Sequence, residues 1–160
     1  MKKGFTMVEL MVVVVIMGVL ASIALPNYKR SLDRARLAEA TSIVGAIERA
    51  IDMYRLQNKA ATAEFLRTGG VRLDIDLTGS LTCNGSGCSS QFFTYAASCS
   101  AGACSIQVNP TTNFQSNLPS LNSVRGASIG AEWVKTCSGT TKAKELCGHL
   151  EENGFTTQSN

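Results

Sequence analysis

The feature that most constrains this chain is an apolar run over residues 5–25, FTMVELMVVVVIMGVLASIAL, which follows the basic leader MKKG. As a helix this run would be roughly 31 Å long, about the thickness of a bilayer core. A secretory signal peptide has a shorter apolar region that ends in a small-residue cleavage site, whereas here the small residue Gly4 precedes the run. The run therefore predicts a membrane-spanning helix.

Glu9 is the only charged side chain within this run. A carboxylate at mid-depth in a bilayer costs roughly 2.5–3.5 kcal/mol or more, so few such residues persist without a reason. We therefore expect Glu9 to have a partner that relieves its charge.

The run is framed by Gly4-Phe5-Thr6 and Glu9 on one side and by Leu25-Pro26-Asn27-Tyr28 on the other. This arrangement resembles the leader and N-terminal helix of type IV pilins, which type II secretion pseudopilins share. The resemblance covers roughly the first 55 residues, and beyond them only the general layout matches. It implies cleavage between Gly4 and Phe5 by a prepilin peptidase, N-methylation of Phe5, and assembly of the mature subunit into a helical filament.

For Glu9, the resemblance implies a partner in the filament, the Phe5 amine of an adjacent subunit. Within one chain the two groups also lie four residues apart on one helix face, so they could neutralise each other. Pro26 removes a backbone donor, so a kink or a locally opened turn is expected over residues 22–26. This is either a simple bend at the membrane boundary or a segment that melts and lets a packed filament stretch. Phe5, Glu9 and Pro26 are the residues expected to act in assembly.

Charge and motifs limit the other function classes. The formal charge of +3 includes Lys2 and Lys3, and residues 58–160 carry seven basic and seven acidic side chains. A neutral head gives no electrostatic reason to bind nucleic acid or a membrane surface. The sequence has no phosphate-binding glycine motif or nucleophile elbow, and His149 is its only histidine. We expect no enzyme activity, catalytic residue, cofactor or metal, and we place His149 at the surface.

Residues 27–57 predict an amphipathic continuation of the helix. Charged residues, among them Glu48, Asp52 and Arg55, lie opposite an apolar stripe that is expected to pack against the rest of the chain. The stripe comprises Leu32, Ala35, Ala40, Ile43, Val44, Ile47, Ala50, Ile51 and Tyr54. The basic cluster over residues 29–36 either faces solvent and lipid headgroups or pairs with acidic residues of a neighbouring subunit.

The helical period ends after residue 57. Residues 58–80 are expected to form a connecting loop with a short helix over residues 60–67 and turns at Gly69-Gly70 and Thr78-Gly79. From Leu81 the pattern favours an antiparallel sheet over about 81–136, with strands over 92–97, 105–109 and 127–136. Trp133 is expected to pack on the apolar stripe.

The cysteines predict disulfides and an oxidising compartment. They are spaced as Cys83-x4-Cys88, Cys99-x4-Cys104 and Cys137-x9-Cys147, and sequence alone leaves the pairing open. Cys99 and Cys104 flank a short glycine-containing turn, so they could lie opposite each other in a hairpin, and the first pair repeats that arrangement. The resemblance to pilins implies that Cys137 and Cys147 close a C-terminal loop over residues 137–160. Its end, residues 151–160, is expected to fray.

Together these patterns predict an α+β pilin fold. It would consist of a cleaved leader (1–4), a transmembrane or filament-core helix (5–26) and a head (27–160), in which the long helix packs on a small antiparallel sheet. The expected function is that of a structural pilus subunit, a homo-oligomer that needs no nucleic acid and serves adhesion, twitching motility or DNA uptake.

The resemblance also implies where such a subunit resides and what it meets. The precursor would lie in the inner membrane with its head in the periplasm, and would encounter the prepilin peptidase and an assembly platform before it enters an extracellular filament. Two alternatives remain open. One is a type II secretion pseudopilin, and the other is a membrane-anchored binding protein that never polymerises.

Overall fold

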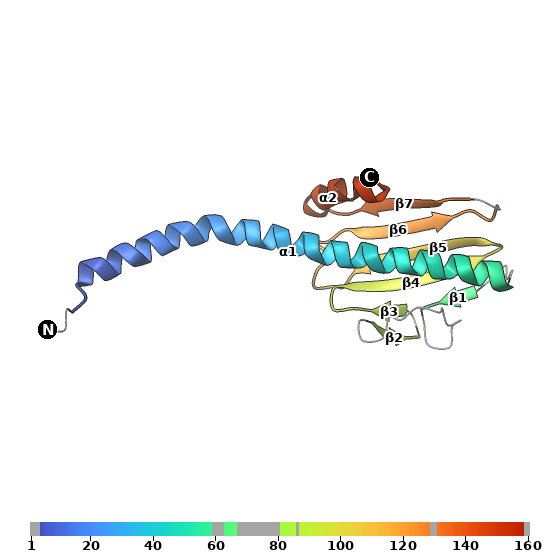
Figure 1. Ribbon diagram of the computed structural model, residues 1–160, viewed down its shortest axis with the longest axis horizontal. Helices are drawn as coiled ribbons and strands as arrows, with labels where there is room; N and C mark the ends of the chain where they lie inside the picture. Colours follow the sequence, from blue (N-terminus) through green and yellow to red (C-terminus); the bar gives the residue numbers. More distant parts are fainter. Residues whose placement is uncertain (1–3, 59–62, 67–80, 86, 129–130, 159–160) are drawn as a thin grey trace. The chain divides into compact units, whose positions relative to one another are not determined.

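The computed structural model describes residues 4–58, 63–66, 81–85, 87–128 and 131–158 (Figure 1). By its internal packing the chain divides into two units, residues 1–35 and 36–160. One helix, α1 (Met7–Asn58), contributes to both units. Each unit is described by itself.

The described part of the first unit consists of a short non-helical segment, residues 4–6, and the N-terminal part of α1. Its large apolar side chains from Phe5 to Leu25 are each 44–86% exposed. Among the described residues, α1 alone is long and apolar enough to cross a membrane by length and composition, with a mean hydropathy of 2.7 in its most apolar window. The apolar helix expected from the sequence is therefore present.

Pro26 lies inside α1, and the helix continues through residues 22–26 without a break. The opened turn that was one expectation for this segment is therefore wrong, and α1 instead curves gently here (Figure 1). Pro26 cannot donate a hydrogen bond to the Ser22 carbonyl. The Ser22 hydroxyl also donates to the Val19 carbonyl at 2.7 Å, a contact that tends to bend helices. One turn is weakened while its neighbours keep it helical.

The second unit packs the C-terminal part of α1 on a largely antiparallel sheet, which confirms the predicted α+β fold (Figure 1). The sheet order is β2-β3-β4-β5-β6-β7-β8, β1 pairs with β4, and β7–β8 is the parallel pair. The strands are β1 (Ala63–Phe65), β2 (Thr82–Asn84), β3 (Gly87–Ser89), β4 (Phe93–Ser100), β5 (Ala103–Pro110), β6 (Ser120–Arg125), β7 (Trp133–Ser138) and β8 (Phe155–Thr157). Helix α2 (Thr141–Cys147) and the 3-10 helix η1 (Gly148–Asn153) lie between β7 and β8 in the chain.

The core forms where the apolar stripe of α1 meets one face of the sheet. Along β4 and β5 buried and exposed residues alternate, so that Phe93, Tyr95, Ile106 and Val108 point into the core. Burying each large apolar side chain contributes about 1.5–3 kcal/mol. From α1 the buried residues include Ala40, Ile43, Val44, Ile47, Ala50 and Ile51 of the predicted stripe and also Leu37.

Strands β4 and β5 are longer than the sequence pattern indicated because a tight turn joins them. Ala101 and Gly102 both have positive φ, at 49° and 83°, which matches the twist that a two-residue hairpin requires. The ladder therefore extends to Ser100 and Ala103, and Cys99 lies directly opposite Cys104.

Residues 63–65 correct the prediction of a short helix over residues 60–67. They form β1, antiparallel to β4, and Phe65 is buried with its ring edge-to-face on Tyr54 at 5.2 Å. Pairing with a distant strand here outweighs local helix propensity. Residues 59–62, and the turns expected at Gly69-Gly70 and Thr78-Gly79, lie outside the described residues.

The C-terminal part holds three further differences from the expectation. Strand β6 was not predicted, and the strand expected over 127–136 is β7, Trp133–Ser138. Residues 151–157 are not frayed: they complete η1 and form β8, where Phe155 is 3% exposed and pairs with Lys135. A lone aromatic in a polar tail gives no periodic signal, so its burial depends on the strand that receives it.

Candidate functional site

The start of α1 is a reciprocal cap between Thr6 and Glu9. The Glu9 carboxylate accepts hydrogen bonds from the Thr6 amide at 2.9 Å and the Thr6 hydroxyl at 2.7 Å. In return, the Glu9 amide donates to the Thr6 hydroxyl oxygen at 3.3 Å. This is a capping box, which satisfies amide groups that a helix start otherwise leaves unpaired. The T-x-x-E spacing was the signal that the sequence analysis missed.

The cap also fixes where the helix begins relative to the bond expected to be cut. Gly4, Phe5 and Thr6 are exposed and precede α1, and the first helical hydrogen bond runs from the Leu10 amide to the Thr6 carbonyl at 3.3 Å. The Gly4–Phe5 peptide bond therefore lies outside the helix, where its polar groups are not held by helical bonds. In this uncut chain the Phe5 nitrogen is an amide, and the partner of Glu9 is Thr6.

Beyond the cap, the first unit presents apolar side chains on every side of the helix. Large apolar residues are exposed from Phe5 to Leu25, and Glu9 is the one charged group among them. A surface of this kind is not stable in water and requires lipid or other apolar helices around it. Chemically, the segment can insert, associate and present one carboxylate near its tip.

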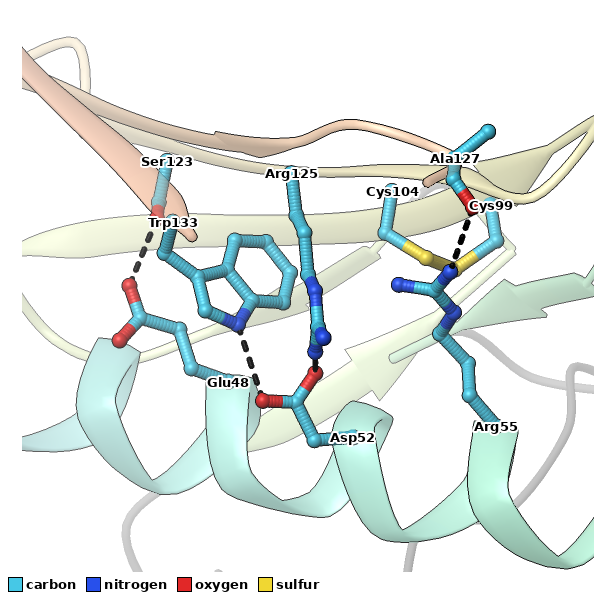
Figure 2. Close-up of polar contacts among 9 residues, drawn as sticks. All are labelled: Glu48, Asp52, Arg55, Cys99, Cys104, Ser123, Arg125, Ala127 and Trp133. Carbon is cyan, nitrogen blue, oxygen red and sulfur yellow. Dashed lines mark hydrogen bonds and ion pairs between the residues drawn. A yellow bond between two sulfur atoms is a disulfide. The ribbon is translucent and has the colours of Figure 1, made fainter. Parts of the chain in front are cut away.

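Between α1 and strands β6 and β7, the second unit contains a polar seam formed by Glu48, Asp52, Ser123, Arg125, Trp133 and Lys135. The sequence prediction for its two acids was wrong. Glu48 and Asp52 were assigned to the helix face opposite the apolar stripe, yet both face the sheet (Figure 2). The Ser123 hydroxyl donates to the Glu48 carboxylate at 2.6 Å, and the Lys135 ammonium lies 2.9 Å from its other oxygen. Glu48 is only 7% exposed, so these contacts compensate for its loss of water.

Asp52 makes the second half of this seam, one turn further along α1. It forms an ion pair with Arg125 and accepts a hydrogen bond from the Trp133 indole nitrogen at 3.2 Å (Figure 2). Trp133 therefore packs near α1 as predicted, but its indole N–H points to the Asp52 carboxylate. The i, i+4 spacing of Glu48 and Asp52 places both carboxylates on one face of the helix. That spacing was the signal in the sequence from which their shared face could have been predicted.

Two arginines of α1, Arg55 and Arg36, make further contacts with the rest of the second unit. A nitrogen of the Arg55 guanidinium donates to the Ala127 carbonyl at 3.4 Å (Figure 2). The Arg36 guanidinium lies 4.5 Å from the ring centre of Phe92 and 5.1 Å from that of Phe114. Arg36, the last residue of the basic cluster, is thus partly buried on aromatic rings, which favours a cation–π contact.

The six cysteines form three disulfides, each between two cysteines that follow one another in the order of cysteines along the chain. Cys83–Cys88 and Cys99–Cys104 each join directly opposed residues of a hairpin, β2–β3 and β4–β5. Cys137–Cys147 joins β7 to the end of α2, and both of its cysteines are fully buried.

No second chemical centre is found in the described parts of the chain. His149 is exposed, and among the described residues no group of three or more His, Cys, Asp or Glu could hold a metal ion.

Comparison with known proteins matches the N-terminal segment. A family model, the prokaryotic N-terminal methylation motif, matches residues 1–25. The type II secretion system core protein G of Klebsiella michiganensis is 47% identical over 57 residues, which are 36% of this chain and 40% of that protein. The Escherichia coli core protein G is likewise 47% identical over 57 residues, 39% of its length. The type IV major fimbrial protein FimA of Dichelobacter nodosus is 40% identical over 79 residues, 49% of this chain and 51% of FimA.

These matches cover only part of each protein. The chain spans between about two fifths and one half of the length of the curated relatives named above. No solved structure matches this chain significantly. The resemblance drawn from residues 4–28 is confirmed, because the methylation motif, the fimbrial protein and the secretion proteins all match.

Proposed function

We propose that this type IV pilin-like chain is a structural subunit of a helical filament, a type IV pilus. The precursor is held in the inner membrane by the apolar part of α1, with its head in the periplasm. A prepilin peptidase cuts between Gly4 and Phe5 and methylates the new Phe5 amine. An assembly platform then moves the mature subunit into an extracellular fibre built from copies of the same chain.

One observation carries this proposal: the exposed Gly4–Phe5 bond lies directly before a capped helix whose large apolar side chains are exposed as far as Leu25. A membrane anchor alone explains the apolar surface but not a carboxylate near its tip. A filament explains both, because neighbouring helices cover the apolar side chains and a neighbouring amine meets the acid.

Assembly in this proposal is an exchange of partners at Glu9. Before cleavage, the carboxylate is held by the amide and hydroxyl of Thr6. Cleavage creates a cationic amine at Phe5, and a charged hydrogen bond is about twice as strong as a neutral one. In the fibre, Glu9 accepts from the Phe5 amine of an adjacent subunit, so that neither charge is buried alone.

A type II secretion pseudopilin is the second candidate, and the likeness to core protein G supports it. One feature favours the pilin, since the match to the fimbrial protein extends over more of the chain. The three disulfides suit an oxidising compartment and fit both candidates. In either case the subunit enters a helical assembly. Whether the pilus serves adhesion, motility or DNA uptake is a separate question for phenotype assays.

The test is expression of the full chain in a host that has a prepilin peptidase and a pilus assembly system. We expect surface fibres in electron micrographs of the sheared fraction, and a subunit that begins at methylated Phe5 in mass spectra. Fibres confined to short periplasmic stubs would identify the pseudopilin. An uncut subunit with Met1 and no fibre would contradict the proposal and support a non-polymerising anchored binding protein.

A Glu9→Gln variant tests the role of the charge. Glutamine keeps an acceptor for Thr6 but cannot form an ion pair with the Phe5 amine. We expect the variant to reach the membrane in normal amounts and to be absent from fibres. A matched control, Glu39→Gln, removes a carboxylate from an exposed position of α1 and is expected to assemble. Abundant fibres of the Glu9 variant would contradict the pairing.

A further inference from the structure

A small pocket with several polar side chains in its lining lies on the sheet face that points away from α1. It has a volume of about 280 Å³ and is formed by strands β2 to β5. Ser89, Thr94 and Asn109 are direct neighbours across β3, β4 and β5, and they form one wall. On the same face, two residues along, Gln107 pairs with Ala96. Asn84 of β2 lines the pocket at the end of the sheet.

The hollow exists because two of these positions carry small residues. Ala96 and Gly87 lie where larger side chains would fill the space between the polar groups. Gly87 cannot be larger, since a Cβ there would lie 2.7 Å from the Tyr95 carbonyl oxygen. The Cys83–Cys88 disulfide ties β2 to β3 and so holds Asn84 beside the hollow.

Hydrogen bonds already orient the polar side chains of the pocket. The Thr94 hydroxyl donates to the Asn109 carbonyl at 3.1 Å, and the Ser89 hydroxyl donates to the Thr82 carbonyl at 3.3 Å. Each hydroxyl oxygen is therefore presented as an acceptor. The Asn84 side-chain oxygen accepts from the Gly87 amide at 3.1 Å, which fixes this side chain beside the pocket, and Gln107 contributes a second amide. The pocket thus combines acceptors and donors on a rigid ladder.

The chemistry of the lining identifies the class of ligand. Among the described residues that line the pocket none is charged, so an ionic ligand would find no counter-charge from them. The lining offers amides and hydroxyls, and sugar hydroxyls both donate to and accept from such groups. The volume lies near the lower end for small-molecule sites, about 300–1,000 Å³, which suits one ring of an oligosaccharide. We propose that this pocket binds a neutral saccharide.

This inference goes beyond the filament function and does not depend on it, because the pocket is complete within one chain. It is tested by NMR titration of the full chain in micelles of a zwitterionic detergent, since detergents with a sugar headgroup would compete. The probes are the methyl glycosides of glucose, galactose, mannose and N-acetylglucosamine, with glucuronate as the anionic comparison. We expect saturable shifts of amides in β3, β4 and β5 with at least one neutral glycoside, with a Kd on the order of 1 mM.

Two variants on the exposed face of β4 separate pocket binding from surface effects. Ala96→Leu fills the hollow and should weaken binding by at least about tenfold. Ser98→Leu places the same side chain on the same face outside the pocket and should bind like the unaltered chain. If Ala96→Leu does not fold, Gln107→Ala, which removes a lining amide, should weaken binding instead.

Three results would overturn the proposal. The first is the absence of saturable shifts with every neutral glycoside, and the second is an equal affinity for glucuronate. The third is binding that survives in a folded Ala96→Leu variant and in Gln107→Ala.

Discussion

At the scale of single residues, Thr6 shows how a side chain next to the proposed cleavage site can define the start of a helix. Its hydroxyl and amide bond to Glu9, and the first helical hydrogen bond ends on its carbonyl. A capping residue of this kind contributes about 1 kcal/mol to its helix. In lipid, where no water replaces a lost partner, the contribution matters more.

Thr6→Ala should therefore fray the first turn of α1. The variant loses the hydroxyl and with it two hydrogen bonds to Glu9, one donated to the carboxylate and one accepted from the amide. The amides of residues 7–9 should therefore exchange with solvent about fivefold faster. Thr6→Ser keeps the hydroxyl and is the matched control. The measurement is hydrogen exchange by NMR on the full chain in detergent micelles. Equal exchange in both variants would show that the cap does not stabilise the helix start.

Tyr95 illustrates a different residue-scale effect, because its ring is 1% exposed in the core. Burial raises the pKa of Tyr95 to about 12 from an ordinary value of 10.0, and the charge of Glu39 adds to the increase. The folded chain therefore keeps a proton that the unfolded chain releases between pH 10 and about 12. Stability from this group is complete below pH 10 and is lost as pH rises towards 12.

Tyr95→Phe should remove this part of the alkaline destabilisation. Between about pH 9 and pH 12, we expect its unfolding free energy to fall by about 1–2 kcal/mol less than that of the unaltered chain. Urea unfolding of the detergent-solubilised full chain at several pH values measures it. Tyr28→Phe, at an exposed position of α1 within the first unit, is the control. Parallel pH profiles for all three chains would contradict the prediction.

At the scale of elements, α1 is held on the sheet by apolar packing and by the polar seam. The seam contacts β6 through Ser123 and Arg125 and β7 through Trp133 and Lys135. Apolar packing between these strands and α1 is non-directional, whereas ion pairs and hydrogen bonds form only when the paired residues lie opposite each other. The seam therefore determines where along α1 the C-terminal strands lie.

Lys135→Met should expose the cost of a buried charge in this seam. Glu48 would keep only Ser123 as the partner shown for its carboxylate, and its side chain is 10% exposed. We expect a loss of about 2 kcal/mol, less than for a fully buried pair because Lys135 is itself 23% exposed. Adding Glu48→Gln removes the charge and keeps an acceptor for Ser123, so the double variant should recover stability.

Chemical unfolding of the three variants, Lys135→Met, Glu48→Gln and the pair together, measures this coupling. The double variant should be more stable than Lys135→Met alone. A double variant that is less stable than either single variant would show that the seam does not depend on charge pairing.

At the scale of the whole molecule, the three disulfides differ in what they connect. Cys83–Cys88 and Cys99–Cys104 lie within single hairpins, whereas Cys137–Cys147 joins a strand to the segment that leads into η1 and β8. A disulfide that closes a longer loop restricts more of the unfolded chain, and Cys137–Cys147 spans a sequence separation of 10 against 5 for each of the other two.

Replacing Cys137 and Cys147 by alanine should destabilise the head by about 3 kcal/mol, against about 2 kcal/mol for the Cys83 and Cys88 pair. The second pair is the matched control, because it also removes one bridge but closes a shorter loop and has Cys83 exposed. Thermal unfolding of the detergent-solubilised full chain compares the two. An equal loss of Tm, or a larger loss for the control, would contradict this ranking.

The elements that sequence predicted correctly are those with a local periodic signal. The apolar run and the stripe of α1, and the alternation in β4 and β5, all repeat over several residues of one segment. The elements that it missed depend on distant partners: β1 on β4, β6 between β5 and β7, and β8 on β7. The capping box was readable from T-x-x-E, and the polar seam only in part from the spacing of Glu48 and Asp52.

The sequence by itself determined that this chain has a long apolar helix with one acid near its start, an N-terminal methylation motif and a small β-rich head. These follow from local chemistry, because hydropathy, helical period and motif spacing involve neighbouring residues. Only the tertiary structure decided that Glu48 and Asp52 face the sheet and that Phe155 is buried where β8 pairs with β7. It also decided that a pocket forms beside Ala96 and Gly87 on the sheet face that points away from α1. Such features depend on which strands become neighbours, and pairing between distant segments leaves no periodic trace in the sequence.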